Sequence, residues 1–257
     1  MARTLPVIDG QTPFQDEYLP VLLDAVNQLK AGLGKNLHSI YVHGSVARRE
    51  ARPGKSDLNL TLIVEKPLNA SEQSVLSTLK WRIASHHPVI PGVTLKAGDL
   101  TKVLSLEAIF RWGFWLKHCC LCLYGDDLAS RFGCFEASWD IAKAMDGDIK
   151  KELSEYRAKI MATKVVKNYL DYCEAVARKM LWSCFSLVLH REQRLALSLR
   201  QCADAFLRHY PDKSLEIGRL FILVERTQVP KKASLFMIET FGGWIVDEFD
   251  KIDRKIG

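Results

Sequence analysis

A glycine-serine turn between two β-prone segments constrains this chain more than any other feature. Residues 39–43 (SIYVH) form a short β-prone run that ends at Gly44 and Ser45. Residues 58–65 (LNLTLIVE) alternate apolar and polar side chains and then become solidly apolar, which predicts a largely buried strand. The intervening residues 45–51 are compatible with a helix. The segment therefore predicts strand, short helix and strand.

The rest of the first half continues an α/β pattern. Residues 16–33 have the apolar spacing of an amphipathic helix, and Gly34 follows where such a helix ends. Asn69 followed by Glu72 resembles a capping box, which predicts a helix through about residue 85. Residues 93–96 are a candidate third strand. We expect a mixed sheet with flanking helices.

The second half is predicted to be helical. After about residue 102 the pattern becomes helical, apart from a polar turn at residues 124–127, and from residue 151 one helical segment follows another. We therefore predict two domains, an α/β domain at residues 1–135 and an all-α helical bundle at residues 136–257.

The glycine-serine turn and the following strand offer groups that bind phosphate and metal. Gly44 has no β-carbon, so a ligand can approach its backbone closely. A helix that begins after Ser45 offers unpaired N–H groups to a phosphate, and the hydroxyl of Ser45 can add a contact. Residues 57 and 59 of a strand point to the same face. Acidic groups at two such positions can hold magnesium beside a triphosphate.

These residues resemble the signature of the nucleotidyltransferase superfamily, whose fold is that of DNA polymerase beta. That signature is Gly-Ser, a spacer, and then Asp-x-Asp or Asp-x-Glu flanked by apolar residues. Within the superfamily, the chain is most similar to the streptomycin and spectinomycin (aminoglycoside) adenylyltransferases. Residues 92–95 (GVTL), 110–118 (FRWGFWLKH) and 123–128 (LYGDDL) also resemble parts of that family.

The resemblance implies an activity, its cofactors and its site residues. Family members transfer a nucleoside monophosphate from an NTP to a hydroxyl group, with two metal ions and three carboxylates. It implies ATP and Mg²⁺ as cofactors, and a small molecule or a protein as the acceptor. Asp57 and Asn59 take the catalytic and metal-binding positions. The residues expected to contact the nucleotide are Gly44, Ser45, Arg48, Arg49, Lys55 and Ser56. The basic residues among them are alternatively a solvated polar face.

The chain departs from the family at two of the three acidic positions. Asp57 matches the first acid, Asn59 occupies the second position and Gly92 occupies the third. Asp99 and Glu107 are possible substitutes because they lie close by in sequence. Two-metal catalysis at full rate is not expected, because each lost charge removes on the order of 4 kcal/mol of interaction at an effective dielectric of about 20. The alternative function is a degenerate relative that binds a nucleotide or a partner as a sensor or regulator.

Composition limits the partners and the compartment. The formal charge is +6, from 36 basic and 30 acidic residues, an excess too small to indicate nucleic acid as a partner. The seven cysteines are irregularly spaced, which is typical of free thiols in a reducing cytoplasm. We find neither a secretory signal nor an apolar run of transmembrane length. We therefore expect a cytoplasmic protein without a membrane partner.

Overall fold

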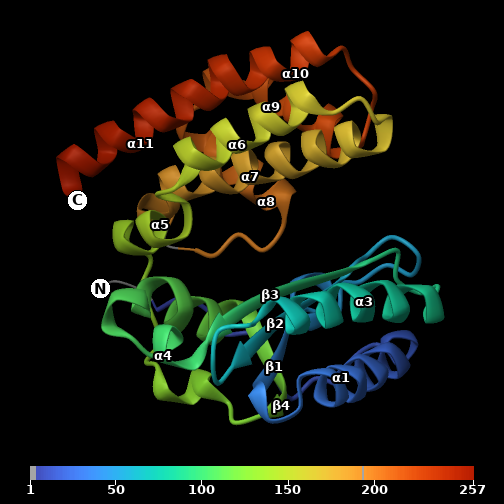
Figure 1. The fold of residues 1–257 in the computed structure, drawn as a ribbon. Helices are drawn as coiled ribbons and strands as arrows, with labels where there is room; N and C mark the ends of the chain where they lie inside the picture. Colours follow the sequence, from blue (N-terminus) through green and yellow to red (C-terminus); the bar gives the residue numbers. More distant parts are fainter. Residues whose placement is uncertain (1–3, 193) are drawn as a thin grey trace. The chain divides into compact units, whose positions relative to one another are not determined.

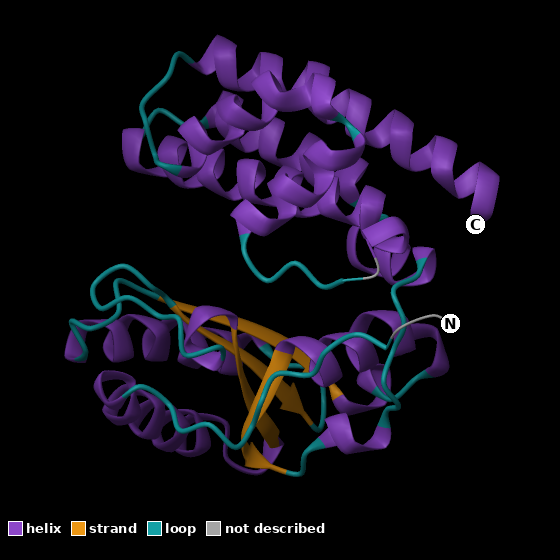
Figure 2. Cartoon of the chain, turned by 180° about the vertical axis from the view of Figure 1, so that it is seen from behind, coloured by secondary structure: helices purple, strands orange, loops and turns teal. Residues whose placement is uncertain are grey.

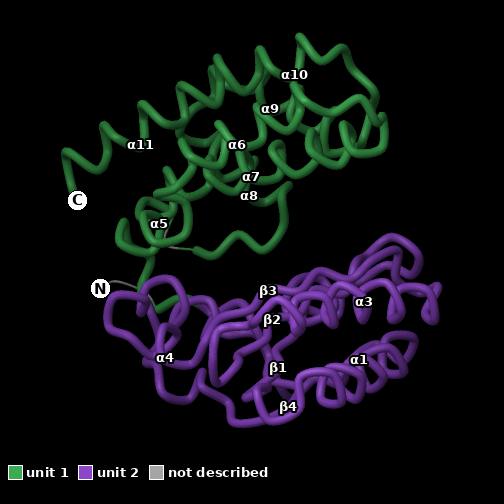
Figure 3. The backbone as a smooth tube through the Cα atoms, viewed as in Figure 1, with its two compact units in different colours: residues 1–5, 136–257 green, residues 6–135 purple. Residues whose placement is uncertain are grey.

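The computed structural model describes residues 4–192 and 194–257, which separate into two compact units. One unit is Pro6–Phe135, and the other is Glu136–Gly257 together with Thr4 and Leu5 (Figure 3). An isolated β-bridge joins Thr4 to Glu136 and ties the start of the described chain to the second unit. The predicted division into independent domains at residue 135 stays a prediction.

A four-stranded mixed sheet organises the first unit (Figures 1 and 2), as expected. Its strands are β1 (Leu37–His43), β2 (Leu58–Val64), β3 (Val93–Asp99) and β4 (Cys120–Gly125), in the order β3-β2-β1-β4. The pair β2–β3 is parallel, whereas β1 pairs with β2 and β4 in antiparallel fashion. The three strands predicted from sequence are thereby confirmed.

Two helices, α1 (Leu19–Leu33) and α3 (Ala70–His86), cover one face of the sheet. Gly34 ends α1 with φ of 52°, a backbone conformation that glycine adopts without strain. The side chain of Asn69 accepts a bond from the backbone N–H of Glu72, and the Glu72 side chain accepts one from the N–H of Asn69. Both helix boundaries thus follow from the local signals that predicted them. Their buried side chains are Val21, Leu22, Ala25, Leu29, Leu33, Leu76, Leu79 and Ile83.

The opposite face of the sheet packs against an irregular helical segment. This segment contains α4 (Leu100–Val103) and the turns η3 (Leu106–Ala108), η4 (Ile109–Gly113), η5 (Trp115–Cys119) and η6 (Leu128–Arg131). The turns η4 and η5 are π-helical, a rare geometry that is frequent at functional sites. The buried residues of this second core are Tyr41, Ile63, Val103, Ala108, Trp112, Leu116, Cys120 and Leu128.

Two local predictions in this unit are wrong. Residues 120–123 were expected within a helical region and residues 124–125 in a polar turn, but residues 120–125 form the edge strand β4, whose backbone pairs with β1. The helix predicted at residues 45–51 ends early, as α2 (Gly44–Ala47), because Arg49 takes the left-handed conformation with φ of 61°.

The second unit is helical, as predicted, and α7 (Val166–Glu192) lies at its centre. Helix α7 packs against α5, α6, α8 and α9. The other elements are α5 (Trp139–Asp146), α6 (Ile149–Ala162), α8 (Leu199–His209), η7 (Pro211–Lys213), α9 (Ser214–Val224), α10 (Lys231–Met237), η8 (Ile238–Gly242) and α11 (Gly243–Ile256).

None of the helices in the described ranges combines the length and the apolar character that a membrane crossing requires.

Candidate functional site

The pairing of the strands gathers the predicted site residues at one end of the sheet. His43, the last residue of β1, pairs with Asn59, and Leu58 at the start of β2 pairs with Val93 at the start of β3. Gly44 follows β1, Asp57 precedes β2 and Gly92 precedes β3, so all three lie at the same end of the sheet.

Gly44 and Asn59 are in close contact at this end of the sheet. Gly44 has φ of 77°, and a β-carbon built on it would stand 3.1 Å from Nδ2 of Asn59. The same nitrogen donates a hydrogen bond of 3.4 Å to the backbone oxygen of Asp57. A side chain at position 44 would therefore occupy the space between the turn and β2, and glycine keeps that space open.

Asp57 lies against the third position of the signature. A β-carbon on Gly92 would stand 3.1 Å from Oδ1 of Asp57. The backbone N–H of Leu58 donates to the Gly92 oxygen over 3.0 Å, which holds the starts of β2 and β3 together. The position where the family resemblance places its third acid thus faces the one carboxylate that this chain retains.

The residues at this end of the sheet fit one magnesium ion and do not fit two. Asp57 offers a carboxylate, and Asn59 offers a neutral carbonyl oxygen. Among residues 4–192 and 194–257, no group of three His, Cys, Asp or Glu side chains is placed to hold a metal ion. Magnesium is commonly held by one or two carboxylates plus substrate phosphates, so a Mg–NTP complex fits this donor set. A second ion lacks the two further carboxylates that would hold it.

Of the two suggested substitute acids, Asp99 does not lie at this end of the sheet. The side chain of Asp99 caps α4, where its Oδ1 accepts a bond of 3.0 Å from the N–H of Lys102. Asp99 is the last residue of β3, so it lies at the opposite end of the strand from Gly92. Glu107 is exposed on η3. The sequence suggestion that Asp99 replaces the third carboxylate is therefore wrong, whereas the suggestion of Glu107 stays a prediction.

The two arginines after Gly44 have different surroundings. Arg48 is largely buried, its Nε lies 2.9 Å from Oε2 of Glu50, and its charge contributes to lowering the pKa of His43. The guanidinium of Arg49 donates to the backbone oxygens of residues 12, 13 and 47 and lies over the Phe14 ring, 4.6 Å from its centroid. Arg48 is thus placed beside the strand end, whereas Arg49 anchors the N-terminal segment to the turn.

The remaining predicted phosphate contacts lie in α2 and in the loop before β2. Ser45 is half-buried in α2, and its backbone oxygen accepts a bond from the N–H of Glu50 at 2.9 Å. The hydroxyl of Ser56 accepts a bond of 2.9 Å from the N–H of Arg52, and Lys55 is exposed. Their role in nucleotide binding stays a prediction.

His43, which immediately precedes the turn, is a neutral histidine. Burial, together with the charges of Lys96 and Arg48, lowers its pKa to about 4. Its ring packs edge-on against Trp115, with the ring centroids 4.8 Å apart. Within the described part of the chain, its buried Nε2 has no hydrogen-bond partner. The positive charges of Lys96 and Arg48 therefore lie near the end of β1, and His43, which ends this strand, adds no charge of its own.

Sequence reasoning did not single out Lys96. This lysine pairs with Thr61, two residues beyond Asn59, and so belongs to the face that carries Asn59. Its Nζ lies over Trp112 and Trp115, 5.0 and 4.6 Å from their ring centroids, and Trp115 donates to the Thr61 hydroxyl at 3.0 Å. A lysine between the apolar residues Leu95 and Ala97 of a strand was the available signal.

Comparison with known proteins establishes the fold. No protein-family model matches the chain, and no curated protein matches its sequence. Among solved structures, it is similar to the crystal structure of spectinomycin adenyltransferase from Enterococcus faecialis with ATP and spectinomycin, with a TM-score of 0.54 and 13% sequence identity. The match covers 89% of this chain and 98% of that chain. The chain thus has the nucleotidyltransferase fold that its sequence motif indicated.

Proposed function

We propose that this protein binds an NTP at the joined ends of β1, β2 and β3 and transfers the nucleoside monophosphate to a hydroxyl group of a small molecule or a protein. One observation carries the proposal: Gly44 abuts Asn59 and Asp57 abuts Gly92 at a single end of the sheet. Because the similar spectinomycin adenyltransferase was solved with ATP, we propose ATP as the nucleotide.

The proposed roles follow from the positions of the residues. Asp57 holds one Mg²⁺ ion of the Mg–ATP complex, and the oxygen of Asn59 is its neutral second donor. That ion, when bound, neutralises phosphate charge. Gly44 admits the phosphates close to the backbone, and Arg48 lies beside the strand end with a positive charge. The chain orients the nucleotide through these groups.

Transfer is expected to be slow because the site lacks two acids. A carboxylate that serves as general base contributes roughly 10²–10⁴ to a rate, and position 92 has no side chain to serve in that way. A second candidate function follows from the same two positions, Asn59 and Gly92. It is nucleotide binding without transfer, in a protein that acts as a sensor or regulator.

Turnover and binding measured on the same variants separate the two functions. The protein is incubated with ATP, GTP, CTP or UTP, with Mg²⁺ or Mn²⁺ and candidate hydroxyl acceptors, and pyrophosphate release is followed. The test variant is Asp57→Asn, which removes the charge and keeps the shape. The control is Glu65→Gln, which removes an exposed acid just beyond the other end of β2.

Release that disappears in Asp57→Asn and persists in Glu65→Gln supports transfer. NTP binding without release, weakened only by Asp57→Asn, supports the regulator. Binding that is equal in both variants would contradict the proposed nucleotide site itself.

A further inference from the structure

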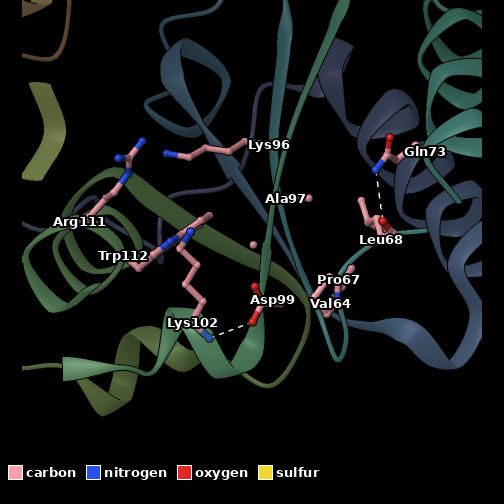
Figure 4. Close-up of a pocket in the computed structure, with 11 residues that line it drawn as sticks. Val64, Pro67, Leu68, Gln73, Lys96, Ala97, Asp99, Lys102, Arg111 and Trp112 are labelled. Atoms are coloured by element: carbon pink, nitrogen blue, oxygen red, sulfur yellow. Dashed lines mark hydrogen bonds between the residues drawn. The ribbon is translucent and has the colours of Figure 1, made fainter. Parts of the chain in front are cut away.

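A cavity of about 510 Å³ lies around the C-terminal end of β3, within the first unit (Figure 4). Its volume falls in the range of small-molecule binding sites. Gly92 marks the end of the sheet where we propose that the nucleotide binds. Lys96 in the cavity wall is four residues farther along the strand, roughly 13 Å at the usual rise of a strand. The cavity therefore extends along β3 away from Gly92, and it shares Lys96 with the surroundings of His43.

Three cations from three different elements line this cavity. They are Lys96 on β3, Lys102 on α4 and Arg111 on η4. The charged ends of Lys96 and Arg111 point toward each other, and Lys102 extends from α4 into the same space (Figure 4). Lysine and arginine side chains are charged at neutral pH, so the cavity gathers positive charge from separate parts of the fold.

One acid accompanies these cations among the lining residues, and its position is explained by the helix beside it. Asp99 is the N-cap of α4, where its Oδ1 accepts the N–H of Lys102 at 3.0 Å. The lining carries three positive charges and one negative charge, which leaves a formal excess of two positive charges. An oxyanion with two negative charges complements this excess.

Packing holds one of the cations in place. Nζ of Lys96 lies over the rings of Trp112 and Trp115. The Trp112 ring is only 5% exposed and packs so tightly on Gly98 that a β-carbon there would stand 2.5 Å from it. A cation held by fixed rings loses less conformational freedom when it binds a ligand than a lysine in solvent does. The remaining wall is partly apolar, from Val64, Pro67, Leu68 and Ala97.

The geometry points to a binding site for a small phosphate ester in this cavity, with the phosphate bound by Lys96, Lys102 and Arg111 and the organic part against the apolar wall. Phosphate monoesters carry close to two negative charges at neutral pH and three strong acceptor oxygens, which matches three converging cations. The site does not depend on nucleotidyl transfer at the other end of the strand.

Calorimetric titration with glucose 6-phosphate tests this site, with glucose and succinate as comparison ligands. The test variant is the double substitution Lys102→Ala and Arg111→Ala, which is expected to fold because both side chains are exposed. The matched control is the double substitution Lys35→Ala and Lys80→Ala, which removes two exposed charges elsewhere in the same unit.

We expect glucose 6-phosphate to bind, glucose not to bind, and the test variant to lose about tenfold or more in affinity. The control and Asp57→Asn should change the affinity less than about twofold. Absence of binding at millimolar concentration, equal binding of glucose, or equal affinity of the test and control variants would overturn the site. Succinate binding as tight as that of glucose 6-phosphate would overturn the assignment to phosphate. A loss of glucose 6-phosphate affinity in Asp57→Asn would show that the phosphate binds at the end of the sheet proposed for the nucleotide instead.

Discussion

Oδ1 of Asp57 lies so close to the Gly92 backbone that a β-carbon at position 92 would stand only 3.1 Å from it. Position 92 therefore faces the retained carboxylate across the start of two parallel strands. An acid placed there, together with an acid at position 59, would surround a metal ion with three carboxylates.

The double substitution Asn59→Asp and Gly92→Glu is expected to strengthen metal binding. Two added carboxylates beside Asp57 increase the attraction for a divalent cation, and they repel one another without it. We expect Mn²⁺ to bind about tenfold more tightly or better, measured by calorimetry. The melting temperature should also depend more strongly on Mg²⁺ than that of the parent protein.

A control for crowding is the pair Asn59→Asp and Gly92→Gln. Glutamine adds a side chain of the same size as glutamate without its charge, so its metal affinity should remain below that of the glutamate variant. Equal affinities in the two variants would show that position 92 is not where a third acid acts.

The buried imidazole of His43 should make the protein sensitive to acid. Burial lowers its pKa to about 4, whereas an unfolded chain has a histidine pKa near 6.5. Above about pH 6.5 both states are neutral, and below it the unfolded state takes up a proton first, so stability falls with pH between about 6.5 and 4. The full loss is about 3 kcal/mol. Urea unfolding of the parent and of His43→Gln across this range measures it, and an unchanged pH dependence in the variant would contradict this assignment.

The buried ion pair between Asp146 and Lys179 in the helical unit should contribute more to the free energy of unfolding than an exposed ion pair next to it. Asp146 is 5% exposed, Nζ of Lys179 lies 3.0 Å from its Oδ1, and Ser183 and Ser186 donate to the same carboxylate. Burial favours the neutral form of Lys179, but the charges of Asp146, Glu152 and Asp148 together outweigh burial and raise the pKa of the lysine. Lys179→Met leaves the carboxylate without this partner, so we expect a loss of about 3–5 kcal/mol in the free energy of unfolding.

The adjacent residue Arg178 supplies the matched control for that prediction. Its pair with Glu174 is on the surface of the same helix, with a distance of 2.9 Å. Arg178→Met is expected to cost no more than about 0.5 kcal/mol in urea unfolding. Losses of similar size in the two variants would mean that the carboxylate of Asp146 is stabilised without Lys179.

Local sequence signals predicted the parts of the fold that depend on near neighbours. The Asn69–Glu72 cap and the alternation along residues 58–64 are examples, because each is specified within a few residues. Strand β4 was missed because its hydrogen bonds come from β1, far away in sequence. The early end of α2 was missed because the positive φ of Arg49 accompanies its bonds to carbonyl groups of residues 12 and 13.

Some residues of the candidate site could likewise be predicted from local sequence, and one could not. The signature identified Gly44, Asp57 and Asn59 because their spacing is short and the strand alternation orients them. Lys96 was missed because its place on the same face depends on the parallel register with Thr61 and on Trp115, which lies in a later element. Contacts of that kind are not visible in any single segment of the sequence.

Gly44 and Gly54 allow the phosphate approach to be tested by a matched pair of substitutions. Both glycines have positive φ, 77° and 69°, so alanine costs about 1–2 kcal/mol of strain at either position. A β-carbon at Gly44 meets Nδ2 of Asn59 at 3.1 Å, whereas one at Gly54 meets no heavy atom of the described residues within 4 Å. Gly44→Ala should therefore weaken ATP binding about tenfold or more in calorimetric titration, and Gly54→Ala less than about twofold. Because both alanine variants carry the same kind of backbone strain, equal ATP affinities in the two variants would show that the nucleotide does not approach the backbone at Gly44.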